Sequence, residues 1–143
     1  MHTPTVASPR AGSRETPVPA YLAGFLLIGL GLSVAGPALS HLRDRVHTTD
    51  GGIAWLFVGQ SAGYILGSVF AGHGLDSGRG HRRWVAAMVG ATCSIVLIAL
   101  APSLALLVAA FAVLGGACGL CDVSGNTLVM WSRPEGPGAL LNA

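Results

Sequence analysis

The chain has 143 residues, of which 52% are hydrophobic and only 10% are charged. Soluble domains carry about a quarter charged residues, so this chain could not cover a globular surface with polar groups. We therefore expect its solvent to be lipid. Eight arginines against six acidic residues leave a net charge of +2, with no lysine in the chain. That charge is too small to indicate a nucleic-acid partner.

Residues 1–19 have the composition of a disordered tail. They are rich in Pro, Ser and Thr and also hold Arg10, Arg14 and Glu15. A segment of this kind cannot bury enough apolar surface to order itself. We expect it to lie on the cytoplasmic side of the membrane.

Four apolar stretches follow, each long enough to cross a bilayer, since a spanning helix needs about 20 mostly apolar residues. They run over residues 20–40, 52–72, 84–101 and 104–131. Pro102 and Ser103 separate the last two, which predicts a tight hairpin. The expected fold is all-α: a polytopic membrane protein with four transmembrane helices in the region 20–131.

The placement of arginine predicts the orientation, because short loops rich in Arg or Lys stay cytoplasmic. The tail, the loop 72–83 and Arg133 fall on one side of a four-helix zigzag. The other side has Arg43 and Arg45, which Asp44 and Asp50 offset. We expect a multi-pass protein of the cell membrane with its N-terminus in the cytoplasm.

Small residues recur at four-residue spacing in two of the predicted helices. This spacing lets helix backbones approach closely in lipid. The stripes are Gly59, Gly63 and Gly67 in the second helix and Gly115 and Gly119 in the fourth. Asp122 and Asn126 continue the fourth-helix stripe along the same face.

Asp122 is the strongest functional clue, because it is the one acid between Trp84 and Leu128. A carboxylate in a spanning helix is costly, and such groups usually face a protein interior or a water-filled path where they act. Asn126 would supply a neighbouring hydrogen-bonding group. Gln60 could bind solute hydroxyls if it faces inward, although it could equally join two helices.

The loop 72–83 is the second clue. The residues that we expect to act in this loop are Gly72, Asp76, Arg79, Gly80, Arg82 and Arg83. An acid and bases so placed could form ion pairs that hold helix ends together on one face of the membrane and release them later. The plainer interpretation is a solvated, positively charged cytoplasmic loop.

This loop resembles the signature of the major facilitator superfamily: glycine, three residues, Asp-Arg, then a glycine and paired basic residues. Gly72, Asp76, Gly80, Arg82 and Arg83 match that order, with a slightly longer spacing before the paired arginines. Ser77 stands where the family has arginine, and Arg79 is placed to take over that role. The resemblance implies that the loop gates a transporter.

The run from Gly115 to Asn126 resembles the fourth helix of the fucose permease branch of sugar transporters. In that branch the acid belongs to a proton-coupling site, so the resemblance implies a proton or substrate contact for Asp122. The branch also has a first-helix acid a few residues before a proline. Lined up on Pro37, this chain has Ser33 at that position.

The superfamily fold has two six-helix halves, and its substrate binds at the midplane between them. Residues 132–143 read as a cytoplasmic loop followed by the start of a fifth helix that is cut short. We therefore expect part of the N-terminal half of a longer transporter. Its partners would be the lipid bilayer, a small solute, a coupling H⁺ or Na⁺, and the remaining helices or another subunit.

No motif of a hydrolase, phosphate-binding or dinucleotide-binding enzyme occurs in the sequence, so we expect neither an enzyme nor a cofactor. Cys118 and Cys121 have the spacing of a metal pair, but the sequence lacks a second pair or a nearby histidine, and we expect no metal. The favoured function is secondary active transport of a small polar solute such as a sugar, which would make the chain a symporter. The alternative is a non-transporting or oligomeric four-helix membrane protein.

Overall fold

The structure is a computed structural model that describes residues 18–73 and 80–132. It contains α1 (Val18–Arg45), α2 (Asp50–Gly72), α3 (Gly80–Leu100) and α4 (Leu104–Ser132). The described ranges hold no strand, so the all-α prediction is confirmed. Most of the expected tail and nearly all of the segment 132–143 lie outside the described residues.

The helices have the length and apolar character of membrane spans. α2, α3 and the Leu104–Met130 part of α4 each qualify, and α1 qualifies as a fourth span if its two arms are counted together. The arms, Pro19–Leu30 and Ala35–Arg45, meet at 44°. Pro37 lies inside this helix and explains the bend, because proline removes a helical hydrogen bond and its ring clashes with the preceding turn.

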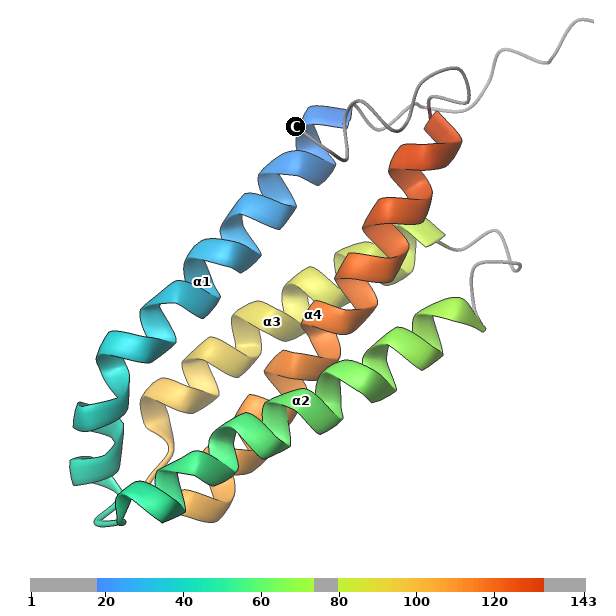
Figure 1. Cartoon of the computed structure of the whole chain (residues 1–143). Coiled ribbons are helices and arrows are strands. Elements are labelled where there is room, and N and C mark those ends of the chain that lie inside the picture. The colour runs from blue at the N-terminus through green and yellow to red at the C-terminus, as the bar shows by residue number, and fades with distance from the viewer. Residues whose placement is uncertain (1–17, 74–79, 133–143) are drawn as a thin grey trace, which may run out of the picture.

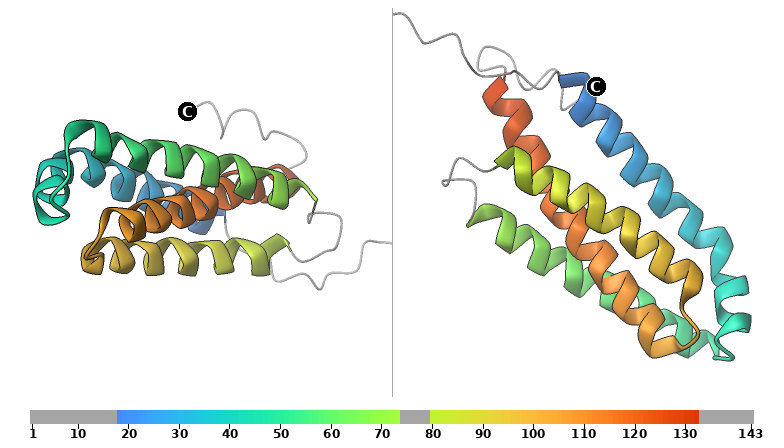
Figure 2. Two further views of the ribbon diagram at one scale, coloured as in Figure 1. Left: turned by 90° about the horizontal axis from the view of Figure 1, so that it is seen from below. Right: turned by 180° about the vertical axis from the view of Figure 1, so that it is seen from behind.

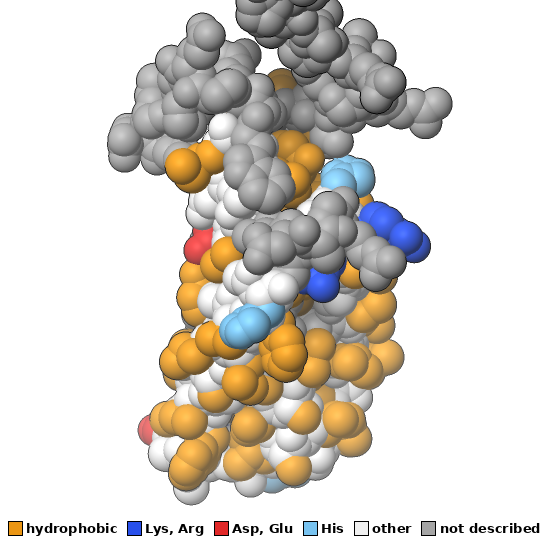
Figure 3. Space-filling model, turned by 90° about the vertical axis from the view of Figure 1, so that its right-hand side faces the viewer, with side chains coloured by type: hydrophobic (Ala, Val, Ile, Leu, Met, Phe, Trp, Pro, Cys, Tyr) orange, Lys and Arg blue, Asp and Glu red, His pale blue; other side chains and the backbone are white. Residues whose placement is uncertain are grey.

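The four helices run alternately up and down the bundle (Figures 1 and 2). We call the end where α2 finishes and α3 begins the loop end, and the opposite end, with the connections 46–49 and 101–103, the hairpin end. α4 packs most extensively on α2 and next on α3, whereas α1 makes fewer contacts. In Figure 3 apolar side chains cover most of the described surface, and the visible arginines lie towards the loop end.

The close packing of α2 on α4 follows from the glycine stripes predicted above. A side chain at Gly63 would collide with the main-chain carbonyl of Ala112, and one at Gly67 with that of Gly116. From the other helix, a side chain at Gly115 would meet the carbonyl of Gln60. Glycine is needed at these positions because backbone meets backbone.

A cluster of buried hydrophobic residues packs the helices together at the hairpin end. It contains Leu42, Ile53, Leu56, Ala101, Leu107 and Phe111. At the loop end, Tyr21 of α1 packs edge-on against Trp84 of α3, with ring centroids 5.2 Å apart. A side chain at Gly24 would collide with the indole of Trp84, and one at Gly125 would meet the ring of Phe25 first and then the indole.

Two helix boundaries lie at least four residues away from the prediction, and the others lie within two residues of it. α1 continues to Arg45 instead of ending near residue 40, because Arg45 donates from Nη1 to Ala99 O at 2.7 Å and from Nη2 to Ile98 O at 2.5 Å. These carbonyls lie in the last turn of α3, where a helix lacks its own donors. α3 begins at Gly80, so Arg82 and Arg83 belong to its first turn and not to a loop.

Candidate functional site: an acid between two helices beside a pocket

The carboxylate of Asp122 is held by a hydrogen bond to each of its oxygens. The hydroxyl of Tyr64 donates to Oδ2 at 2.6 Å, and Nδ2 of Asn126 donates to Oδ1 at 3.0 Å. Asp122 is half-buried and turned toward α2, the helix that carries Tyr64. Hydrogen bonds to a carboxylate are stronger than those between neutral groups, so this arrangement fixes the acid in place.

The local sequence explains this geometry. Asn126 lies four residues after Asp122 and so occupies the same face of α4. Tyr64 directly follows Gly63, one of the glycines that draw α2 onto α4. On the partner helix, a side chain at Gly119 would collide with the main-chain carbonyl of Tyr64. The glycines therefore bring the phenol and the acid within reach of each other.

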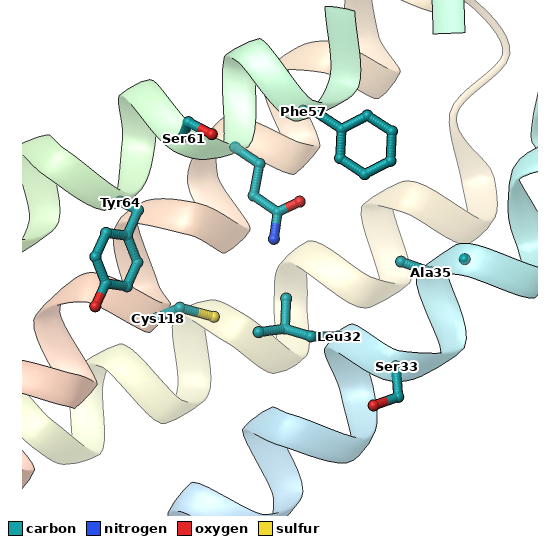
Figure 4. Close-up of a pocket in the computed structure, with 9 residues that line it drawn as sticks. Leu32, Ser33, Ala35, Phe57, Ser61, Tyr64 and Cys118 are labelled. Carbon is teal, nitrogen blue, oxygen red and sulfur yellow. The ribbon is translucent and has the colours of Figure 1, made fainter. Parts of the chain in front are cut away.

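A pocket of about 560 Å³ lies next to this group, between α1, α2 and α4 (Figure 4). Its lining residues are Leu32, Ser33, Ala35, Gly36, Phe57, Gln60, Ser61, Tyr64 and Cys118. The α2 residues among them recur at helical spacing, so one face of α2 forms a wall of the pocket. Cys118, one turn before Asp122, supplies the contribution of α4.

The pocket combines an aromatic face with several polar groups. Phe57 offers a flat apolar surface, and Ser61 offers a hydroxyl group from the same helix (Figure 4). Gln60, also of α2, adds an amide group. Ser33 Oγ from α1 donates to the carbonyl of Gly29 at 2.8 Å and keeps its lone pairs to accept a further bond. A mostly apolar cavity with a few placed polar groups is typical of small-molecule sites.

The residues predicted to bind the solute or the coupling ion thus lie in two neighbouring groups, one around the Asp122 carboxylate and one in the pocket lining. Asp122 and Asn126 are hydrogen-bonded to each other, whereas Gln60 lines the pocket. Tyr64, which sequence reasoning missed, belongs to both groups. Its position four residues after Gln60 and next to the glycine stripe was the available signal.

The predicted gating loop is only partly described. Gly72 ends α2, Gly80 starts α3, and Arg82 and Arg83 follow in the first turn of α3. Asp76, Ser77 and Arg79 lie outside the described residues. The ion-pair latch expected for this loop therefore stays a prediction.

The cysteines are free thiols. Cys121 Sγ lies 3.8 Å from the carbonyl oxygen of Trp84, and Cys118 is buried at the pocket wall. Within residues 18–73 and 80–132, no three His, Cys, Asp or Glu side chains come together in a way that could hold a metal ion.

These features define a multi-pass helical membrane protein with an acid inside the bundle and a pocket beside it. The sequence profile of the Major Facilitator Superfamily matches residues 21–136. The chain therefore belongs to this superfamily, and the resemblance found in the loop and the fourth helix is confirmed at that level.

Several relatives are proteins named for sodium-dependent glucose transport. The chain is 28% identical over 117 residues to sodium-dependent glucose transporter 1 of Homo sapiens, covering 80% of this chain and 23% of that protein. It is 27% identical over 110 residues to sodium-dependent glucose transporter 1 of Xenopus laevis, and the match covers 76% of this chain and 22% of that protein. It is 26% identical over 117 residues to sodium-dependent glucose transporter 1A of Mus musculus, and the match covers 80% of this chain and 28% of that protein.

The chain thus spans about a quarter of the length of these curated relatives. No solved structure matches it significantly. The resemblance of the fourth helix to the fucose permease branch stays a prediction.

Proposed function

We propose that this chain forms the coupling part of a secondary active transporter for a sugar. The observation that carries the proposal is the Asp122 carboxylate, held between α2 and α4 by Tyr64 and Asn126 beside the pocket. A carboxylate can exchange a proton or bind a sodium ion, and either event changes its charge. Inside a membrane such a change is energetically large, so it can be tied to conformation.

The pocket is the proposed place for the solute. A sugar ring has an apolar face that can lie on Phe57 and hydroxyl groups that can bond to Gln60, Ser61 and Ser33. Gln60 and Ser61 can both donate and accept, and Ser33 can accept, which suits a hydroxyl. The names of the relatives support D-glucose as the first solute to test and Na⁺ as the first coupling ion.

The loop 72–83 is the proposed gate, on the cytoplasmic side together with the N-terminus. Arg82 and Arg83 stand at the start of α3, and α2 ends at Gly72 at the same end of the bundle (Figure 1). Ion pairs between such bases and the acid of the loop, Asp76, would tie these helix ends together in one state of the transporter. Screening by salt would weaken any such pair that is exposed.

The alternative, an oligomeric protein that associates through its glycine stripes, has less support. Gly63 and Gly67 are buried against α4, and Gly115 and Gly119 are buried against α2. These surfaces are already used within the chain and are not available to a second copy.

The test is uptake of radiolabelled D-glucose into membrane vesicles that carry the protein, under an imposed Na⁺ or H⁺ gradient. Wild-type protein should accumulate glucose with one of the two gradients, and Asp122→Asn should abolish this accumulation. Asp50→Asn at the hairpin end is the matched control and should leave it intact. Equal gradient-driven uptake by wild type and Asp122→Asn would remove the coupling role of Asp122.

A further inference from the structure

Tyr64 is the residue that connects the pocket with the acid. Its ring lies at the pocket wall, next to Cys118 and on the same face of α2 as Ser61 (Figure 4). Its hydroxyl donates to Asp122 Oδ2 at 2.6 Å. Asp122 itself does not belong to the pocket lining. A solute in the pocket therefore meets the phenol before it meets the carboxylate.

We infer that Tyr64 is the positioning residue through which a cation at Asp122 changes the affinity of the pocket for a hydroxylated solute. The inference rests on the proposed function. A phenol has a single hydrogen to donate and lone pairs to accept with. While the charged carboxylate holds that hydrogen, Tyr64 can offer the pocket only its acceptor side.

A cation on Asp122 frees the hydroxyl hydrogen of Tyr64 from the carboxylate. A proton bound to Oδ2 turns the acid into a donor toward the phenol oxygen, and a sodium ion on Oδ2 competes with the phenol hydrogen. In both cases the hydrogen of Tyr64 is released and can be donated to a hydroxyl of the solute. The solute and the cation then favour each other, and the coupling is reciprocal.

The surroundings of Asp122 leave Tyr64 as the partner that can carry this signal across helices. Asn126, the other donor, belongs to α4 and moves together with Asp122. The titratable groups that interact electrostatically with the acid are the phenol of Tyr64 from α2 and the thiols of Cys118 and Cys121 from its own helix. The charged or titratable groups His81, Arg82 and Arg83 lie in the first turn of α3, at the loop end. Residues 22–40 of α1 contain no ionisable side chain, and residues 85–100 of α3 contain only Cys93.

Tyr64 also has the exposure that this role requires. The side chain is 40% exposed, so its ring does not fill a packed core. The ring can stay in place while the hydroxyl hydrogen changes partner, because a phenol needs only to rotate its C–O bond. The switch therefore needs no helix movement at its first step.

The first test is equilibrium binding of radiolabelled D-glucose to the protein in lipid vesicles, with Na⁺ varied at fixed pH and pH varied without Na⁺. We expect the effective cation to raise wild-type affinity by about 5-fold or more, the lower range of allosteric coupling. Tyr64→Phe should bring this ratio close to one. Tyr21→Phe, which removes a phenol hydroxyl near His81 at the loop end, is the matched control and should keep the wild-type ratio. A wild-type ratio in Tyr64→Phe would overturn the inference.

The second test needs no solute, so it separates a failure of the inference from a failure of the proposed function. Dicyclohexylcarbodiimide reacts with protonated carboxyl groups in membranes: the acid proton moves to a nitrogen and the carboxyl oxygen bonds to the central carbon. Tyr64→Phe removes a donor to the charged carboxylate and should speed modification of Asp122 about tenfold, the size expected for one such hydrogen bond. Tyr21→Phe should not change the rate, and Asp122→Asn should abolish the modified peptide.

The combined outcomes are decisive. If wild-type protein binds no glucose but Tyr64→Phe speeds the labelling, the glucose proposal fails and the link between phenol and acid stands. If labelling of Asp122 proceeds at the wild-type rate in Tyr64→Phe, the inferred role of Tyr64 is wrong whatever glucose does.

Discussion

Gly63 of α2 lies directly against the main-chain carbonyl of Ala112 in α4, with no space for a side chain between the two helices. This contact, repeated along the glycine stripes, sets the distance at which Tyr64 and Asp122 meet. The site therefore depends on residues that have no functional groups of their own.

Replacement of Gly63 by alanine should separate α2 from α4. The added methyl group would meet backbone that cannot rotate away, and overpacking of this kind costs about 1–3 kcal/mol. We expect a lower melting temperature in detergent micelles. Gly29→Ala is the control, because apart from the adjoining backbone of its own helix no atom lies within 4 Å of the position that the methyl group would take. Equal stability of the two variants would contradict the packing described here.

Arg45→Gln should loosen α3 from α1 at the hairpin end. The substitution removes a charged donor from the carbonyls of Ile98 and Ala99, at an expected cost of about 1–3 kcal/mol. Arg43→Gln is the comparison, since Arg43 pairs only with the exposed Asp44 and Asp50 among the described residues. Exposed ion pairs contribute little to the free energy of unfolding. If thermal unfolding shows Arg43→Gln to be the more destabilising change, the stabilising role of the Arg45 hydrogen bonds to the end of α3 is contradicted.

The start of α2 should depend on Thr49. Its Oγ1 accepts a hydrogen bond from the amide of Gly52 at 3.2 Å and satisfies a donor that the helix leaves free. Thr49→Ala should therefore lower the free energy of unfolding by about 1 kcal/mol. Thr92→Ala, whose hydroxyl bonds only to a carbonyl of its own helix, should have a smaller effect. Chemical unfolding in micelles measures both.

Gln60→Ala should weaken solute binding without changing its dependence on the cation. The side-chain amide of Gln60 lines the pocket and is not one of the donors to Asp122. The loss of one neutral hydrogen bond lowers the affinity by about 2- to 10-fold. Thr127→Ala, in α4 and outside the pocket lining, should leave the affinity unchanged. Glucose titrations of both variants decide this point. A Gln60→Ala protein with wild-type affinity would place the solute elsewhere.

The sequence was sufficient for the helices and for half of the site. Apolar length predicts the spans, and four-residue spacing predicts that Asn126 lies beside Asp122, because both follow from a single helix. Tyr64 could not be assigned in the same way, since its bond to Asp122 crosses from α2 to α4 and depends on the exact register of two helices. The end of α1 was missed for a similar reason: Arg45 looks like a loop residue until the carbonyls of α3 are placed beside it.

Asp122 is proposed to couple a cation to the solute. The most direct measurement is simultaneous flux of D-glucose and of Na⁺ or H⁺ into the same vesicles, with radiolabelled sodium and a pH-sensitive dye. A fixed ratio of cation to glucose in wild-type protein, lost in Asp122→Asn, is the expected result. Glucose accumulation without cation flux, or the same ratio in Asp122→Asn, would contradict the claim.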